Sequence, residues 1–172
     1  MKSERYSIIY SSKTGNTKKL AETIYNTLSK NECDYYGEVN KINVELSDMI
    51  YIGFWTEKGN ADSITLEFLK KLKNKKIFLF GTAGYGESEK YFDCIINKVK
   101  ENIDSSNTII GTFMCQGKMP LSIRERYEKM REQNNISFNI DNLIANFDKA
   151  LSHPDEDDLK TLEKIILSGV MY

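Results

Sequence analysis

Short apolar runs and amphipathic segments alternate along most of this chain of 172 residues. Four runs are rich in Ile, Phe and Tyr, which is typical of strands buried on both faces of a sheet. They are residues 6–10, 49–54, 77–80 and 108–114. Between them, apolar residues recur three or four positions apart, as in Leu20, Ile24 and Leu28, which is typical of helices with one buried face. A more polar stretch at residues 35–39 is predicted as an edge strand.

This alternation predicts an α/β fold, with a doubly wound five-stranded parallel sheet, right-handed crossovers and helices on both faces. Ligands bind such sheets beyond the carboxyl ends of the strands, where the direction of winding reverses. The loops that follow Tyr10, Gly53 and Phe80 are therefore the candidate binding loops.

The C-terminal third is longer than one crossover needs, and residues 116–153 are predicted as extra helices on the same domain. Ser122 and Glu125 have the spacing of a capping box, which predicts a helix running toward Arg131. Pro154, followed by four acidic residues, is predicted in the first turn of a closing helix.

Composition narrows the class of protein, and the length suits a single domain spanning residues 1–172. With 24 Lys and Arg against 25 Asp and Glu, the net charge of -1 argues against nucleic-acid binding by bulk electrostatics. The longest apolar stretch, residues 49–55, is far short of the ~20 residues of a membrane helix, so no membrane partner and a cytoplasmic location are expected. Three cysteines without a CxxC pair and one histidine predict buried, reduced thiols and no metal site.

The loop after the first predicted strand places small polar residues directly before a helix. A helix start presents unpaired N–H groups and a partial positive charge, and Gly15 lets the backbone approach a ligand closely. These features predict a phosphate site, with a plain helix cap as the alternative. The GxxxxGK[ST] signature of nucleoside triphosphate loops is absent. The candidate residues are Ser12, Lys13, Thr14, Gly15, Asn16 and Thr17.

The loops after the third and fourth predicted strands carry aromatic residues and glycines. Trp55, the only tryptophan, is predicted either to stack on a flat ligand or to fill the core. Three glycines in the later loop allow main chain to lie against such a ligand. The candidates in the earlier loop are Phe54, Trp55, Thr56, Lys58, Gly59 and Asn60. Those in the later loop are Thr82, Ala83, Gly84, Tyr85 and Gly86.

The phosphate-loop pattern resembles that of the flavodoxin family, Ser/Thr-x-Thr-Gly-x-Thr, at Ser12, Thr14, Gly15 and Thr17. The resemblance covers residues 5–115 and implies the strand order 2-1-3-4-5. It also implies FMN, with its 5′-phosphate in this loop and its ring between the two later loops.

The family resemblance further implies that a peptide beside Gly59, on either side of it, turns over when the flavin gains an electron. It leaves open whether Tyr85 or Tyr91 contacts the ring opposite Trp55.

The expected function is that of an FMN-dependent electron-transfer flavoprotein, a one-electron carrier that meets redox proteins transiently as a monomer or weak dimer. The alternative is an FMN-dependent NAD(P)H oxidoreductase of quinone-reductase type, and a flavin-free interaction domain is a third possibility. No catalytic side-chain set is apparent. A basic excess in the extra helices predicts a partner surface, a nicotinamide-phosphate site or a solvated helix face. Its residues are Lys118, Arg124, Arg126, Lys129 and Arg131.

Overall fold

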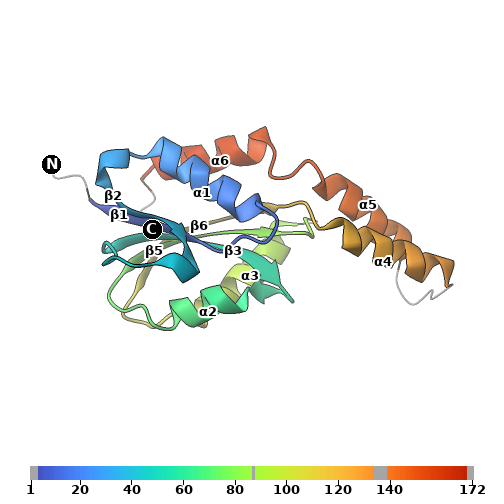
Figure 1. Cartoon of the computed structure of the whole chain (residues 1–172), viewed down its shortest axis with the longest axis horizontal. Helices are drawn as coiled ribbons and strands as arrows, with labels where there is room; N and C mark the ends of the chain where they lie inside the picture. Colours follow the sequence, from blue (N-terminus) through green and yellow to red (C-terminus); the bar gives the residue numbers. More distant parts are fainter. Residues whose placement is uncertain (1–3, 87, 134–138, 170–172) are drawn as a thin grey trace.

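The computed structural model describes residues 4–86, 88–133 and 139–169 and contains a central parallel sheet (Figure 1). The strands of the sheet lie in the order β2-β1-β3-β5-β6, and the short β4 pairs antiparallel with the end of β3. Counting only the parallel strands, this is the predicted order 2-1-3-4-5. The strands are β1 (Tyr6–Tyr10), β2 (Cys33–Glu38), β3 (Met49–Glu57), β4 (Asn60–Ala61), β5 (Lys76–Ala83) and β6 (Thr108–Gln116).

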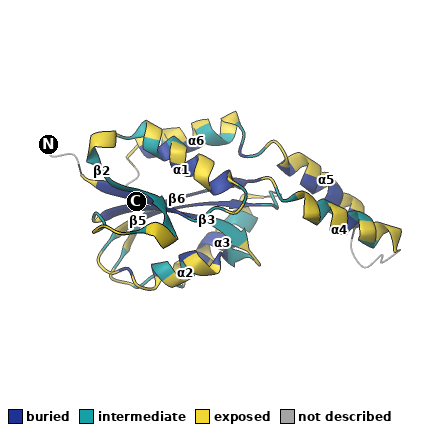
Figure 2. Cartoon of the chain, in the orientation of Figure 1, coloured by how far each residue is buried: buried dark blue, intermediate teal, exposed yellow. Residues whose placement is uncertain are grey.

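Helices cover both faces of the sheet, and two more extend beyond it (Figure 2). Along β1, Tyr6, Ile8 and Tyr10 pack against α1 and α6, while Ile9 belongs to the core that faces α2 and α3. The sheet is therefore buried on both sides, as its continuous apolar runs predicted. The helices are α1 (Asn16–Thr27), α2 (Ser63–Leu69), α3 (Glu89–Lys100), α4 (Leu121–Glu132), α5 (Ile140–Ala150) and α6 (Glu156–Leu167). Two short 3-10 helices span Lys30–Glu32 and Val39–Lys41.

Two strand glycines allow aromatic rings to cross the sheet surface next to the binding edge. A Cβ atom on Gly53 would lie 2.2 Å from the Phe80 ring and 2.9 Å from Cγ2 of Thr17. A Cβ atom on Gly81 would lie 2.5 Å from the Phe54 ring. Glycine at position 53 therefore lets Thr17, in the first turn of α1, pack directly on β3.

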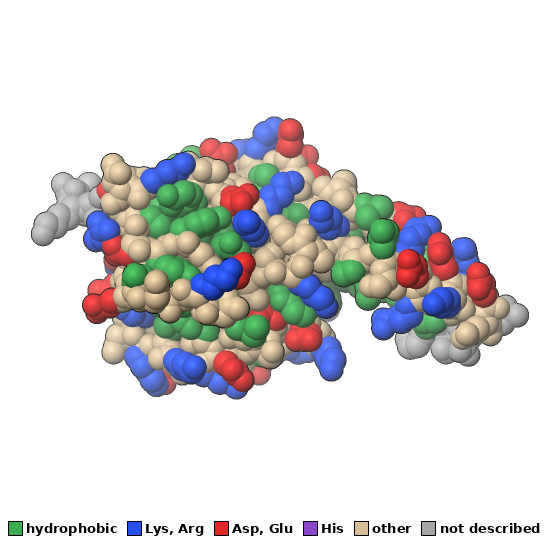
Figure 3. All heavy atoms as spheres, viewed as in Figure 1, with side chains coloured by type: hydrophobic (Ala, Val, Ile, Leu, Met, Phe, Trp, Pro, Cys, Tyr) green, Lys and Arg blue, Asp and Glu red, His purple; other side chains and the backbone are tan. Residues whose placement is uncertain are grey.

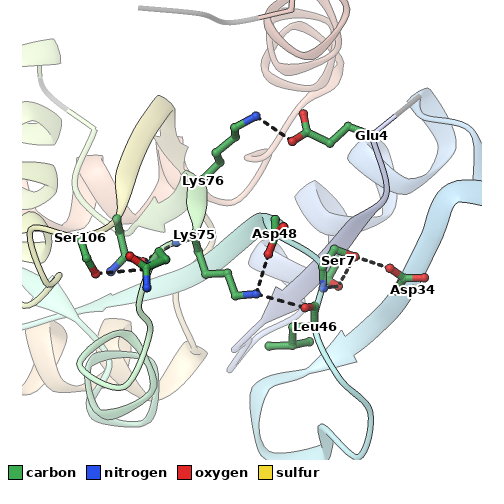
Figure 4. A network of polar contacts seen from close by, with 11 residues as sticks. Glu4, Ser7, Asp34, Leu46, Asp48, Lys75, Lys76 and Ser106 are labelled. Carbon is green, nitrogen blue, oxygen red and sulfur yellow. Dashed lines mark hydrogen bonds and ion pairs between the residues drawn. The ribbon is translucent and has the colours of Figure 1, made fainter. Parts of the chain in front are cut away.

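The amino-terminal edge of the sheet carries a set of polar contacts (Figure 4) and borders a cavity of about 530 Å³, lined in part by Glu4, Tyr6 and Lys76. Lys76 pairs with Glu4 at 2.7 Å, and Lys75 pairs with Asp48 at 3.1 Å. The hydroxyl of Ser7 donates to the Ser47 hydroxyl at 3.1 Å. Exposed ion pairs of this kind contribute roughly 0–1 kcal/mol each, so these two add little to the stability of this edge.

Two predicted helix starts are wrong. The capping box expected at Ser122 is not formed, because Pro120 takes the N-cap position without a side-chain hydrogen bond and α4 begins at Leu121. Pro154 lies before α6 rather than in its first turn, because Asp155 forms the N-cap in a capping box with Asp158. The prediction of buried cysteines is confirmed for Cys115 but is wrong for Cys94, which is exposed.

The helices α4 and α5 form a hairpin that projects past the carboxyl edge of the sheet, the edge at which α1 begins (Figures 1 and 3). The hairpin has a small core of its own around Tyr127, Ile140 and Ile144. Arg124 pairs with Glu128 at 3.2 Å and also with Asp148. Among the described residues, no helix has the length and apolar character that crossing a membrane requires.

Candidate functional site

The loop after β1 forms a turn that presents the first N–H groups of α1. Gly15 is the N-cap at φ 88°, a left-handed conformation that favours glycine, and open space lies beside its Cα atom. The Ser12 hydroxyl accepts hydrogen bonds from the N–H groups of Gly15 at 3.1 Å and Lys18 at 3.3 Å. The N–H groups of Asn16 and Thr17 have no acceptor among the described residues, as is normal for a first helical turn. These two donors, at the positive end of the helix, suit a phosphate.

The side chains of this loop are largely held by the protein itself. Asn16 donates to the backbone carbonyl of Lys118 at 2.8 Å, and Thr14 donates to the same oxygen at 3.4 Å. The Thr17 hydroxyl donates to the Phe54 carbonyl at 3.1 Å and lies 3.1 Å from the Thr82 hydroxyl. Thr17 and Thr82 are both buried. The backbone of the loop, more than its hydroxyl groups, is therefore available to a ligand.

A cavity of about 170 Å³ lies beside the start of α1. It is several times the roughly 30 Å³ that one water molecule occupies in the liquid. Lys19, on its wall, donates to the Pro154 carbonyl at 2.8 Å, and the backbone N–H of Lys118 donates to the His153 carbonyl at 3.0 Å. The junction between α5 and α6 thus closes one side of the predicted phosphate site.

The segment predicted as the first ring loop is mostly a β-hairpin. Strand β3 continues to Glu57 and pairs with β4 through a two-residue turn, in which Lys58 has φ 50° and Gly59 has φ 76°. Positive φ at both central residues is the requirement of a type I′ turn. Gly59 therefore stands at the turn, where the resemblance implied a mobile peptide, and Asn60 opens β4 by accepting the N–H of Ala61.

The side chains of this hairpin have different surroundings. Phe54 is fully buried, so its ring is part of the core and does not face a ligand. Trp55 is half-buried, and the Lys13 ammonium lies over its ring, 5.0 Å from the centroid. The Thr56 hydroxyl is buried and has no hydrogen-bond partner among the described residues. Lys13 and Trp55 thus bring the phosphate loop and the hairpin together, which sequence reasoning did not predict.

The loop after β5 is packed from its outer side by the chain that follows β6. A Cβ atom on Gly84 would lie 2.5 Å from Sδ of Met119, and one on Gly86 would lie 2.5 Å from Oε1 of Gln116. The Gly84 carbonyl accepts from Gln116 at 2.9 Å and from Asn146 at 3.0 Å. On the side where a Cβ atom would stand, these two glycines therefore contact Met119 and Gln116, and close packing by the protein requires glycine there.

Tyr85 and Tyr91 lie side by side, with ring centroids 6.3 Å apart in an edge-to-face arrangement. Burial raises the pKa of Tyr91, so its hydroxyl stays protonated at neutral pH. The two rings contact each other. Whether Tyr85 or Tyr91 contacts the flavin ring stays open, as it was in the sequence analysis.

Two residues at this edge, Met119 and Asn146, were missed by sequence reasoning. Met119 follows β6 and carried a weak signal, because the strand end in an α/β sheet is a binding edge. Asn146 lies within a helix that gives no sign of contacting a loop 62 positions earlier.

A second polar group lies at the junction of α5 and α6. Nδ1 of His153 lies 2.6 Å from Oδ2 of Asp158 and 3.7 Å from Oδ2 of Asp155. Asp155 and Asp158 accept each other's backbone N–H groups, so these carboxylates form the cap of α6.

The arrangement fits a phosphorylated flat ring such as FMN. Two unpaired backbone donors and a left-handed glycine suit the phosphate, since the flavin phosphate is bound by donors and not by a metal. The half-buried Trp55, which contacts Lys13 of the first loop, supplies a large aromatic side chain beside the predicted phosphate site. The side chains of Phe54, Thr17 and Thr82 support the site from within the protein.

Comparisons with known proteins agree with this geometry. A family model described as the flavodoxin domain matches residues 7–167. The chain is 38% identical over 182 residues to the flavodoxin-like domain-containing protein BilS of Clostridium symbiosum (strain WAL-14163), covering 96% of each.

Two solved structures share the fold. A short-chain flavodoxin associated with a non-canonical PDU bacterial microcompartment has a TM-score of 0.60 and 14% identity, over 98% of this chain and 97% of that one. A flavoprotein in complex with FMN from Lactobacillus acidophilus NCFM has a TM-score of 0.50 and 19% identity, over 65% of this chain and 93% of that one.

Proposed function

This chain belongs to the flavodoxin family, and we propose that it binds FMN and carries single electrons between redox proteins of the cytoplasm. The observation that carries the proposal is the convergence of three loops at the carboxyl edge of the sheet. The start of α1, the β3–β4 hairpin and the loop after β5 meet there through Lys13 with Trp55 and through Thr17 with Thr82.

Each loop has a separate part in holding the cofactor. The backbone N–H groups of Asn16 and Thr17 bind the phosphate at the positive end of α1. Trp55 and the main chain around Gly84 hold the ring. Bound FMN supplies both one-electron and two-electron redox chemistry, and the protein chooses between them through the groups around the ring.

Two observations favour a carrier over a hydride-transferring enzyme. The sequence has no GxGxxG signature for a dinucleotide. In the inserted hairpin, Arg124 pairs with Glu128 and Asp148, and Arg131 pairs with Asp141 at 3.6 Å. These internal pairs support a solvated helix face rather than a nicotinamide-phosphate site.

The proposal is tested by stepwise anaerobic reduction of the FMN-loaded protein, followed by visible spectroscopy and potentiometry. Two separate one-electron steps are expected. A single two-electron step, together with prompt bleaching of the flavin by NADPH alone, would identify an NAD(P)H oxidoreductase of quinone-reductase type instead. Protein that stays colourless after incubation with FMN would leave only an interaction module.

A further inference from the structure

The inserted hairpin reaches the ring-side loop through a small buried network of amide groups. Asn146, on α5, donates from Nδ2 to the Gly84 carbonyl at 3.0 Å. Gln116, at the end of β6, donates from Nε2 to the same carbonyl at 2.9 Å and to Oδ1 of Asn146 at 3.0 Å. The network is closed, because each of the three residues contacts the other two.

The network is buried, so the loss of any of its hydrogen bonds has a large energetic cost. Gln116 is 6% exposed and Asn146 is 8% exposed. A buried polar group that loses its hydrogen-bond partner still has its full desolvation cost. Removal of one amide side chain therefore leaves the other groups of the network with fewer partners and destabilises them. By contrast, Asn142 lies on the same helix but is exposed.

The rest of the loop is fixed from the same side. The N–H of Gly117 donates to the Ala83 carbonyl at 2.9 Å. Met119 fills the space beside Gly84, and Gln116 fills the space beside Gly86. Since a peptide unit is planar, holding the Gly84 carbonyl also sets the orientation of the peptide that follows it. The conformation of the loop is thus set by β6 and the hairpin, which lie outside it.

We propose that Asn146 and Gln116 are positioning residues, which hold the loop at Gly84 in the shape that receives the flavin ring. The inserted hairpin then controls how tightly FMN is bound, although it supplies no phosphate donor. This inference rests on the proposed function, and it adds that residues of the hairpin act on the cofactor through the loop after β5.

The test compares Asn146→Ala, Asn146→Asp and the matched control Asn142→Ala. The dissociation constant for FMN is measured by flavin fluorescence, and the thermal stability of the FMN-free protein is measured in parallel. We expect Asn146→Ala to weaken FMN binding by about 5-fold or more, the value of one typical hydrogen bond. Asn142→Ala is expected to bind FMN as the unaltered protein does.

The Asn146→Asp variant keeps the size and shape of the side chain and changes only its hydrogen bonding. It therefore distinguishes a role in holding the loop from a role in filling space. Its carboxylate is acceptor-only and faces the Gly84 carbonyl, so FMN binding at pH 8 is expected to be weaker than in Asn146→Ala. Burial against a carbonyl oxygen raises the pKa of the introduced carboxyl above the usual value of about 3.9, so it gains protons as the pH falls to 5. The protonated carboxyl regains one donor and one acceptor, and the affinity at pH 5, relative to the unaltered protein at the same pH, is expected to recover. This series decides the question if Asn146→Ala does not fold.

Equal FMN affinity in all variants, with lower thermal stability for Asn146→Ala and Asn146→Asp alone, would overturn the inference and leave the network with a purely structural role. In that case the proposed function would stand. If the unaltered protein takes up no FMN, the proposed function and this inference both fail.

Discussion

At the scale of single residues, Thr17 connects the predicted phosphate loop to the sheet. Its hydroxyl is fully buried and bridges the Phe54 carbonyl and the Thr82 hydroxyl, while its backbone N–H remains at the helix start. One residue therefore joins α1, β3 and β5 at the point where the three binding loops leave them.

A double-mutant cycle on this contact gives the first prediction. Thr17→Val keeps the shape of the side chain but leaves the Thr82 hydroxyl without its partner, so it is expected to destabilise the FMN-free protein by about 1–3 kcal/mol. Adding Thr82→Val removes that stranded group, so the double variant is expected to lose less than the sum of the two single losses. Urea unfolding measures all four proteins, and strictly additive losses would contradict the contact.

The sequence pattern predicted which residues form the phosphate loop but not the direction of their side chains. Ser12, Asn16 and Thr17 are all suitable phosphate donors by residue type. In the structure the hydroxyl of Ser12 caps backbone N–H groups, and Asn16 and Thr17 contact other segments. The partners of Asn16 and Thr17 come from distant parts of the chain, and a local pattern carries no information about them.

At the scale of helices and strands, capping decides where the closing helix begins. Asp155 and Asp158 accept each other's N–H groups at 2.9 Å and 2.8 Å. The N–H of Asp158 lowers the pKa of Asp155, because this hydrogen bond favours the ionised carboxylate. A folded pKa below the unfolded value means that the stabilisation is present above the unfolded pKa and is lost as the pH falls through the folded pKa.

The second prediction follows from the lowered pKa of Asp155. Asp155→Ala is expected to lower the melting temperature at pH 7, and the difference from the unaltered protein is expected to shrink as the pH falls below about 4. Asp155→Asn, a capping residue that does not titrate, is expected to stay close to the unaltered protein at pH 7. Circular dichroism melts between pH 7 and pH 2.5 provide the measurement. A deficit for Asp155→Ala that stays constant across this range would contradict the assignment.

The ends of elements were harder to predict than their existence. All five parallel strands were predicted, but β3 runs three residues further than its apolar run, because Lys58 and Gly59 form a turn that returns the chain onto the strand. The start of α4 was predicted from Ser122, yet the neighbouring Pro120 determines it. In the first case a turn extends the strand beyond its apolar run, and in the second a proline starts the helix before the predicted cap.

At the scale of the whole molecule, the sheet and the inserted hairpin have separate cores. The sheet is buried between two helical layers, whereas the hairpin depends on a small cluster around Tyr127, Ile140 and Ile144 (Figure 2). Local stability follows the burial of apolar contacts.

The third prediction is a hierarchy of amide exchange. Backbone amides of α4 and α5 are expected to exchange with solvent at least about 10-fold faster than those of β1, β3 and β5, because the hairpin can open without disturbing the sheet. Hydrogen–deuterium exchange with mass spectrometry at neutral pH resolves these segments. Equal protection of the hairpin and the central strands would show that the two cores unfold as one unit.

The parallel sheet with helices on both faces was predictable because alternating β and α units leave few possible arrangements, and the family resemblance implied its strand order. The place of the hairpin was not, since its sequence indicates only amphipathic helices. Its contact with the site depends on Asn146 and Met119, whose partners at Gly84 lie far away in the sequence.

The crystal structure of the chain loaded with FMN tests the account most directly. We expect the flavin phosphate within hydrogen-bond distance of the backbone N–H groups of Asn16 and Thr17, with the ring between Trp55 and the loop at Gly84. FMN bound with its phosphate elsewhere, or a loop after β1 that contacts no part of the cofactor, would contradict it.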